Sequence, residues 1–159
     1  MTNEMIDILL IEDNEYEAKL TIHNFKKHNL ANHLVHLKNG ALAADFIFAT
    51  GDYRDRDMSI QPKIILLDIN LPLISGMEIL QMIKNDERTK NIPVVILTSS
   101  RDSQDISQGY TLGANSYIVK PVEYKAFSKT ITELGLYWTI LTQYASHIPV
   151  TLWQSIGEA

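Results

Sequence analysis

Short apolar runs, each about the length of a β-strand, alternate along this chain with longer amphipathic stretches. The runs KIILLD at 63–68 and PVVILT at 93–98 are apolar at nearly every position, as in strands that are covered on both faces of a sheet. The stretches between the runs carry apolar residues at a helical spacing. The expected strands are 8–11, 33–37, 63–68, 93–98 and 116–120, and the expected helices follow the first strand and lie at 40–49, 75–84 and about 102–112, with a last one beginning near Pro121.

Strands and helices that alternate in this way predict an α/β fold, a parallel sheet with helices on both faces, because parallel strands are joined by right-handed crossover connections. With 159 residues the chain is long enough for one well-filled core, and folding should bury roughly 70% of the surface that the unfolded chain exposes. We expect one domain over residues 5–146 and a short tail over 147–159. In such sheets ligands bind at the carboxyl ends of the strands.

The expected strands end at side chains that could share one site. Glu12 and Asp13 follow the first strand, Asp68 ends the third, and Thr98 and Lys120 end the fourth and the fifth. Two like charges about 4 Å apart repel by roughly 4 kcal/mol at an effective dielectric of about 20, so three carboxylates at one edge of a sheet need a cation. Mg²⁺ prefers oxygen ligands. The strand ends therefore predict a magnesium site.

A carboxylate at the centre of such a site can act as a nucleophile on phosphorus, as aspartate does in enzymes with aspartyl-phosphate intermediates. Asp68, on the third strand, holds that central place. Lys120 would then meet the phosphoryl oxygens as a point charge, and Thr98 as a hydrogen-bond donor. Each residue taken singly has an ordinary alternative: Asp13 or Asn14 can cap the next helix, and Thr98 and Lys120 can be plain strand-end residues.

Four motifs carry a resemblance to a known family, namely ILLIEDN, IILLDINLPLISGMEIL, IPVVILTSS and LGANSYIVKP. The spacing also fits that family, since Thr98 follows Asp68 by 30 residues and Lys120 follows Thr98 by 22. On these motifs, residues 5–146 resemble the receiver domain of bacterial two-component response regulators. The resemblance implies the flavodoxin-like or CheY-like (βα)5 fold, with five parallel strands in the order 2-1-3-4-5.

The resemblance also implies roles for the acidic residues. Asp68 would be the phosphoacceptor, and Glu12 and Asp13 would form an acidic pair in which Asp13 is a direct magnesium ligand. Asn70 would supply a backbone carbonyl to the metal. By the same resemblance, Asn70 and Ser100 are the positions expected to tune the lifetime of the phosphorylated state.

Members of this family respond to phosphorylation through a switch. The phosphoryl group adds about two negative charges and would draw Thr98 toward it, and Tyr117 would turn inward into the space that Thr98 leaves. Lys120 would bind the phosphoryl group, and the Lys120–Pro121 peptide bond would be cis. The output would be a changed surface on the fourth helix, the fifth strand and the fifth helix. A plain edge-strand aromatic is the alternative interpretation of Tyr117.

Two stretches depart from a minimal receiver. The polar stretch 50–62 predicts an extended surface loop, which either contacts a partner or is a tolerated insertion. The stretch 134–144 is apolar nearly all round, which predicts an interface at Tyr137, Ile140 and Tyr144 through which the chain forms a homodimer. With the loop, this helix resembles the small single-domain regulators that partner phytochrome-type histidine kinases in cyanobacteria and other bacteria.

Composition and charge argue against several other classes of protein. A net charge of −5 disfavours DNA and anionic membrane surfaces as partners. The sequence has no cysteine for disulfides, and none of its stretches approaches the roughly 20 apolar residues of a membrane span. Without a leader pattern at its start, we expect a cytoplasmic protein. Because 13 residues follow Ser146, we also expect a stand-alone receiver with no attached output domain.

The sequence therefore predicts a phosphoacceptor switch rather than a metabolic enzyme. A sensor histidine kinase of the phytochrome type would donate the phosphoryl group to Asp68, and the protein would catalyse only this transfer and its own dephosphorylation. A magnesium-dependent phosphatase is one alternative, but Asn70 stands two residues after Asp68, where such an enzyme typically needs a second aspartate. A receiver-like module that binds partners without phosphorylation is the other.

Overall fold

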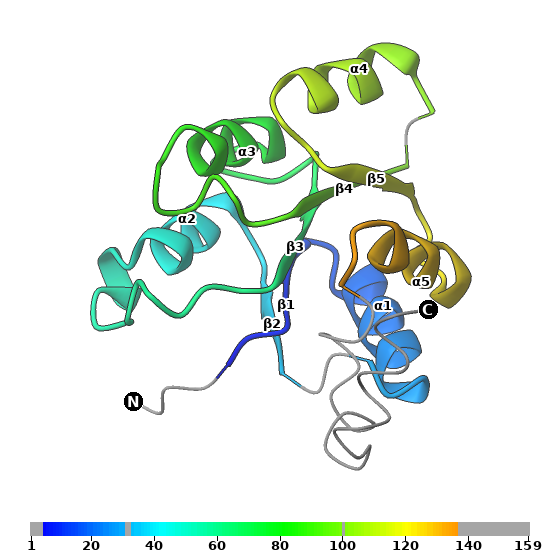
Figure 1. The fold of residues 1–159 in the computed structure, drawn as a ribbon, viewed down its shortest axis with the longest axis horizontal. Coiled ribbons are helices and arrows are strands. Elements are labelled where there is room, and N and C mark those ends of the chain that lie inside the picture. The colour runs from blue at the N-terminus through cyan, green and yellow to red at the C-terminus, as the bar shows by residue number, and fades with distance from the viewer. Residues whose placement is uncertain (1–4, 31–32, 100, 137–159) are drawn as a thin grey trace.

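A parallel β-sheet forms the centre of the molecule. The computed structural model describes residues 5–30, 33–99 and 101–136, and within them five strands pair in the order β2-β1-β3-β4-β5 (Figure 1). This architecture and strand order confirm the expected flavodoxin-like fold. The strands are β1 (Ile8–Ile11), β2 (Leu34–Leu37), β3 (Ile64–Asp68), β4 (Val94–Thr98) and β5 (Ser116–Val119).

Helices cover both faces of the sheet, as Figure 1 shows. Helices α1 and α5 lie on one face, and α2, α3 and α4 lie on the other. This is the layering that right-handed crossovers between parallel strands produce. The helices are α1 (Glu15–Lys27), α2 (Gly40–Phe48), α3 (Gly76–Lys84), α4 (Ser103–Thr111) and α5 (Tyr124–Glu133), and a short 3₁₀ helix, η1, spans Gly51–Tyr53.

Each strand supplies side chains to two separate cores, because successive residues of a strand point to opposite faces. On β1, Ile8 and Leu10 pack toward α1 and α5, and Leu9 and Ile11 pack toward α2 and α3. Strands β3 and β4 are buried at every position, as their unbroken apolar runs predict. The rings of Phe25 on α1 and Phe127 on α5 close the first core, with their centroids 4.1 Å apart.

Side-chain caps fix where most of the helices begin. The side chains of Asn14, Asn39 and Asp102 accept backbone N–H groups in the first turns of α1, α2 and α4. At α3, Ser75 and Glu78 form a capping box in which each side chain accepts a hydrogen bond from the other residue's backbone N–H. The loops at the carboxyl edge of the sheet are therefore held by the helices that follow them.

The last helix begins later than the sequence indicated. We expected it to start near Pro121, but α5 starts at Tyr124. Val122 is buried in the core between α1 and α5, and Glu123, the residue before the helix, has an extended backbone with φ −95° and ψ 152°. The segment after β5 thus places Val122 in the core before the helix starts. The expected start near Pro121, which was based on proline's preference for the first turn of a helix, was therefore wrong.

The extended loop at 50–62 is a surface loop, as expected, and it folds back on α2. The guanidinium of Arg56 lies 3.8 Å from the centre of the Phe46 ring and donates hydrogen bonds to the carbonyl oxygens of Phe46 and Ile60. The side-chain amide of Gln61 donates to the carbonyl oxygen of Ile47 at 3.1 Å. The loop is therefore tied to the end of α2 by side-chain contacts.

Some expectations fall outside the described residues. The predicted interface at Tyr137, Ile140 and Tyr144 lies there, as do Ser100 and the tail at 147–159. Just before that stretch, Leu134 and Leu136 pack against the core between α1 and α5. Within the part of the chain that the structure describes, no helix combines the length and the apolar character that crossing a membrane requires.

Candidate functional site

Three charged side chains from different strands meet at the carboxyl edge of the sheet. The ammonium nitrogen of Lys120, after β5, lies 2.8 Å from Glu12 Oε2, after β1, and 3.0 Å from Asp68 Oδ2, at the end of β3. The side chains of Glu12 and Asp68 are buried, with exposed fractions of 3% and 4%, and that of Lys120 is largely buried at 12%. A buried charge is costly unless it is paired, so removing any one of these three side chains would leave an uncompensated charge in the site.

Asp13 completes an acidic cluster next to this ion pair. One carboxylate oxygen from each of Glu12, Asp13 and Asp68 lies within 4.8 Å of the others. Asp13 is exposed, and it is Asn14 whose side chain caps α1 by accepting the Glu17 backbone N–H at 3.0 Å. The Asp13 carboxylate therefore does not serve as the cap of α1. Three carboxylates this close together are a donor set that suits a hard divalent cation.

Two further residues from the sequence analysis lie beside Asp68. The backbone N–H of Asn70 donates to Asp68 Oδ1 at 3.2 Å, so both carboxylate oxygens of Asp68 are engaged, one by Asn70 and one by Lys120. Thr98 is buried at the end of β4, the strand next to β3, and its carbonyl oxygen accepts the Lys120 backbone N–H at 2.8 Å. The structure thus gathers all the residues expected at the strand ends at one edge.

The aromatic residue of the expected switch faces outward. Tyr117 on β5 is 36% exposed, and its ring meets that of Tyr110 on α4 edge to face, with the centroids 5.8 Å apart and the planes at 81°. Tyr117 is therefore turned away from Asp68 in this structure. The Lys120–Pro121 peptide bond, which follows β5, is cis.

Burial and the neighbouring charges perturb two groups of the site in the same direction. Burial raises the pKa of Glu12 to about 7; the hydrogen bond from Lys120 opposes this increase, and the nearby charge of Asp68 adds to it. Burial alone would lower the pKa of Lys120, but hydrogen bonds to Glu12, Glu17 and Asp68 raise it above its usual value. Near neutral pH the site thus holds a firmly charged ammonium and a carboxyl group that readily takes up a proton.

Two residues that touch the site were missed in the sequence analysis. Glu17, in the first turn of α1, places its Oε2 2.8 Å from the Lys120 ammonium nitrogen. His36, on β2, has its Nε2 2.8 Å from the carbonyl oxygen of Glu12. The only signal for Glu17 was its place five residues after Glu12, one turn into the following helix, and acidic residues are common there for another reason, the helix dipole.

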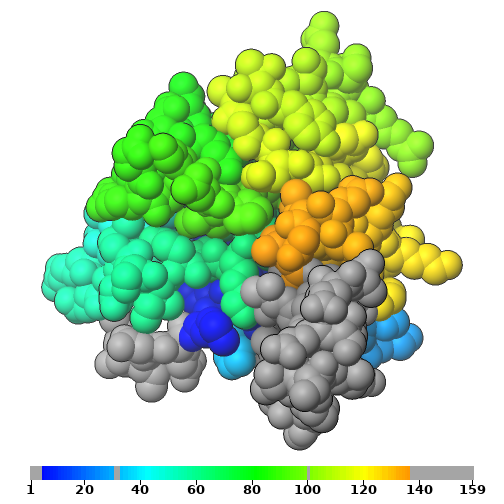
Figure 2. All heavy atoms as spheres, viewed as in Figure 1, coloured from blue at the N-terminus to red at the C-terminus, as the bar shows by residue number. Residues whose placement is uncertain are grey.

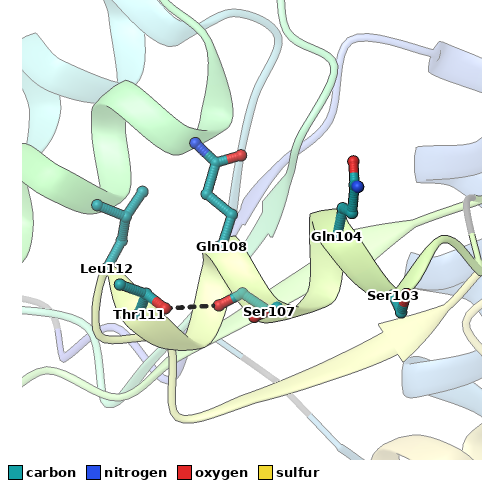
Figure 3. A pocket seen from close by; sticks show the side chains of 6 residues that line it. All are labelled: Ser103, Gln104, Ser107, Gln108, Thr111 and Leu112. Atoms are coloured by element: carbon teal, nitrogen blue, oxygen red, sulfur yellow. Dashed lines mark hydrogen bonds between the residues drawn. The ribbon is translucent and has the colours of Figure 1, made fainter.

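Among the described residues, one hollow lies beside α1 and another lies on α4. A groove of about 450 Å³ runs between α1 and the segment after β5, and its lining includes Glu17, Leu20, Lys120 and Val122. A second hollow, of about 570 Å³, lies on α4 (Figure 3) and is lined by Ser103, Gln104, Ser107, Gln108, Thr111 and Leu112. Its lining carries only hydroxyl, amide and aliphatic groups, so the groove beside Lys120 is the one that borders the charged site.

Comparison with known proteins gives one consistent family. A model of the response regulator receiver domain matches residues 8–132. FilR2, a probable methanogenesis regulatory protein of Methanothrix harundinacea, is 35% identical over 132 residues, which cover 82% of this chain and 82% of that protein. Response regulator Rcp1 of Synechocystis is 34% identical over 131 residues, which cover 82% of this chain and 87% of Rcp1.

Solved structures agree with the sequence relatives. The bacteriophytochrome response regulator AtBRR is 42% identical, with a TM-score of 0.75 over 85% of this chain and 96% of that one. The Mn²⁺-bound form of Rcp1 is 33% identical, with a TM-score of 0.68 over 84% of this chain and 94% of that one. The chain therefore belongs to the response regulator receiver domain family, the phosphorylation-based signalling switches of two-component systems.

Proposed function

We propose that Asp68 accepts a phosphoryl group from a phosphohistidine of a sensor histidine kinase, in a reaction that requires Mg²⁺. The observation that carries this proposal is the buried contact between Asp68 and Lys120, 3.0 Å long, beside the carboxylates of Glu12 and Asp13. A carboxylate held next to an ammonium and a cluster of hard oxygen ligands suits phosphoryl transfer better than it suits a purely structural ion pair.

The transfer exchanges one bond to phosphorus for another. An oxygen of Asp68 attacks the phosphorus atom, the P–N bond to the kinase histidine breaks as the P–O bond forms, and the imidazole leaves with the electron pair of the broken bond. Glu12, Asp13, Asp68 and the Asn70 carbonyl would hold Mg²⁺, which when bound neutralises charge on the phosphoryl oxygens. Lys120 contributes a second, fixed positive charge from the protein itself.

Thr98 and Tyr117 would pass the change on to the surface. Thr98 lies one strand away from Asp68, and its hydroxyl can donate to a phosphoryl oxygen. Tyr117 would turn inward and leave its edge-to-face contact with Tyr110. The surface formed by α4, β5 and α5 would then differ between the two states, and Figure 2 shows α4 (yellow-green) and α5 (orange) on the face turned to the viewer. The phosphoryl group can shift this equilibrium only by its different affinity for the two states.

The partners follow from the relatives and belong to the same proposal. AtBRR is named as a bacteriophytochrome response regulator, which supports a phytochrome-type kinase as the donor. A homodimer formed through the stretch 134–144, a receiver domain over 5–146 and a cytoplasmic location are part of the same proposal. The protein would act as a switch, with catalysis limited to its own phosphorylation and dephosphorylation. The Asn70 side chain, an amide, cannot shuttle a proton as the second aspartate of a phosphatase does.

Phosphorylation by a small donor tests the proposal. The protein is incubated with acetyl phosphate and Mg²⁺ and its intact mass is measured over time, with Asp68→Asn as the matched variant. One added phosphoryl group that is absent in Asp68→Asn is the expected result. Continuous release of phosphate without a stable adduct would instead indicate a phosphatase, and no labelling at all would indicate a module that works without phosphorylation.

A further inference from the structure

The ammonium group of Lys120 has no hydrogen-bond donor to spare. Its nitrogen lies 2.8 Å from Glu12, 2.8 Å from Glu17 and 3.0 Å from Asp68. A lysine ammonium has three N–H donors, and three carboxylates here take all of them. Any further acceptor, such as a phosphoryl oxygen on Asp68, must therefore displace one of these partners.

The three carboxylates differ in how much free energy it costs to break their contact with the Lys120 ammonium. The side chains of Glu12 and Asp68 are 3% and 4% exposed, whereas that of Glu17 is 43% exposed. A buried carboxylate that loses its partner is left as an uncompensated charge, but an exposed one turns to water at little cost. The groove of about 450 Å³ that Glu17 lines gives its side chain room to move. Of the two glutamates that hold Lys120, Glu17 is therefore the one that can be released at little cost.

We propose that Glu17 is a displaceable counter-ion of Lys120 that makes the phosphorylated state less stable. The inference rests on the proposed function, because it concerns the same Asp68 site. A phosphoryl group on Asp68 competes with Glu17 for the Lys120 ammonium, and it places about two negative charges close to the Glu17 carboxylate. Both effects oppose phosphorylation. Glu17 acts through Lys120, so it is a positioning residue and not a catalytic one.

Removing the charge of Glu17 should accordingly strengthen the binding of a phosphoryl group. Lys120 would remain held by Glu12 and Asp68, and its third N–H donor would meet only a neutral amide in Glu17→Gln and would become available in Glu17→Ala. Glu15 offers a matched control, because it lies in the same first turn of α1 and pairs with Lys38 at 2.7 Å instead of with Lys120. Glu17→Gln and Glu15→Gln remove the same charge from the same turn and differ in their contact with Lys120.

The test measures the affinity for beryllofluoride, which mimics a phosphoryl group on a carboxylate, in the presence of Mg²⁺, by ¹⁹F NMR titration. We expect Glu17→Gln to bind about fivefold more tightly than the unchanged protein, the upper end for a partly exposed ion pair, and Glu15→Gln to bind equally well. Glu17→Ala, as a second variant, should shift in the same direction as Glu17→Gln. A purely structural role would predict the opposite, since a disturbed site binds more weakly.

Each other outcome counts against the inference in a recognisable way. Unchanged or weaker binding by both Glu17 variants overturns it while the proposed function stands. Equal tightening in Glu15→Gln overturns it as well, because the effect would then reflect general surface charge. If the unchanged protein takes up no beryllofluoride, the proposed function itself fails and the inference falls with it.

Discussion

The affinity of the site for Mg²⁺ should depend on pH through Glu12. Burial raises the pKa of Glu12 to about 7 in the metal-free protein, so near neutral pH a proton would compete with the proposed Mg²⁺ for the same carboxylate. Below that pKa the ionised fraction of Glu12 falls about tenfold for each pH unit, and between pH 8 and pH 6 it changes from about nine-tenths to about one-tenth. The apparent affinity for Mg²⁺ should therefore fall about tenfold over this interval.

Isothermal titration calorimetry at pH 6, 7 and 8 measures this dependence. Titrations in two buffers with different enthalpies of ionisation also give the number of protons released, which should be about one half near pH 7 if Glu12 titrates there. Because Glu12 and Asp68 interact, the measured midpoint belongs to the pair and not to Glu12 alone. Glu12→Gln should bind Mg²⁺ more weakly and with a flat pH profile. An equally flat profile in the unchanged protein would refute the reasoning.

Three further predictions concern stability and the switch. A raised folded-state pKa makes Glu12 stabilising at low pH, so the metal-free protein should gain up to about 3 kcal/mol of unfolding free energy as pH falls from 8 to 5, a gain that Glu12→Gln should lose in urea titrations. Leu66→Ala, in fully buried β3, should cost about 2–5 kcal/mol in the same assay, and a loss below about 1 kcal/mol would contradict the packing described. A double-mutant cycle of Tyr110→Ala and Tyr117→Ala should give a coupling of about 0.5–1.5 kcal/mol that shrinks with beryllofluoride and Mg²⁺ present, and an unchanged coupling would count against inward rotation of Tyr117.

Much of the fold could be predicted because the apolar runs of the central strands are compatible with few arrangements other than a sheet covered on both faces. The runs that form β3 and β4 are apolar at nearly every position and have the length of strands, and a sheet covered on both faces buries such runs completely. Once the strands are parallel, their last residues must share an edge. That is why Glu12, Asp68 and Lys120, far apart in sequence, could be expected to meet.

Other parts of the site depended on packing that the sequence does not display. Pro121 favours a helix start locally, but burial of Val122 in the core delays α5 to Tyr124. Glu17 resembles any acidic residue in the first turn of a helix, and only the position of the Lys120 ammonium in space gives it a role. Periodicity locates elements and strand ends, but it does not show which side chain of one element reaches across to another.

The central claim is that Asp68 takes up a phosphoryl group only when a divalent cation occupies the acidic cluster. The most direct measurement is to treat the protein with acetyl phosphate, once with Mg²⁺ and once with a chelator, and to map the modified residue by tandem mass spectrometry. We predict modification at Asp68 with Mg²⁺, and none with the chelator or in Asp13→Ala. Modification of another residue, or equal labelling of Asp68 without the metal, would contradict it.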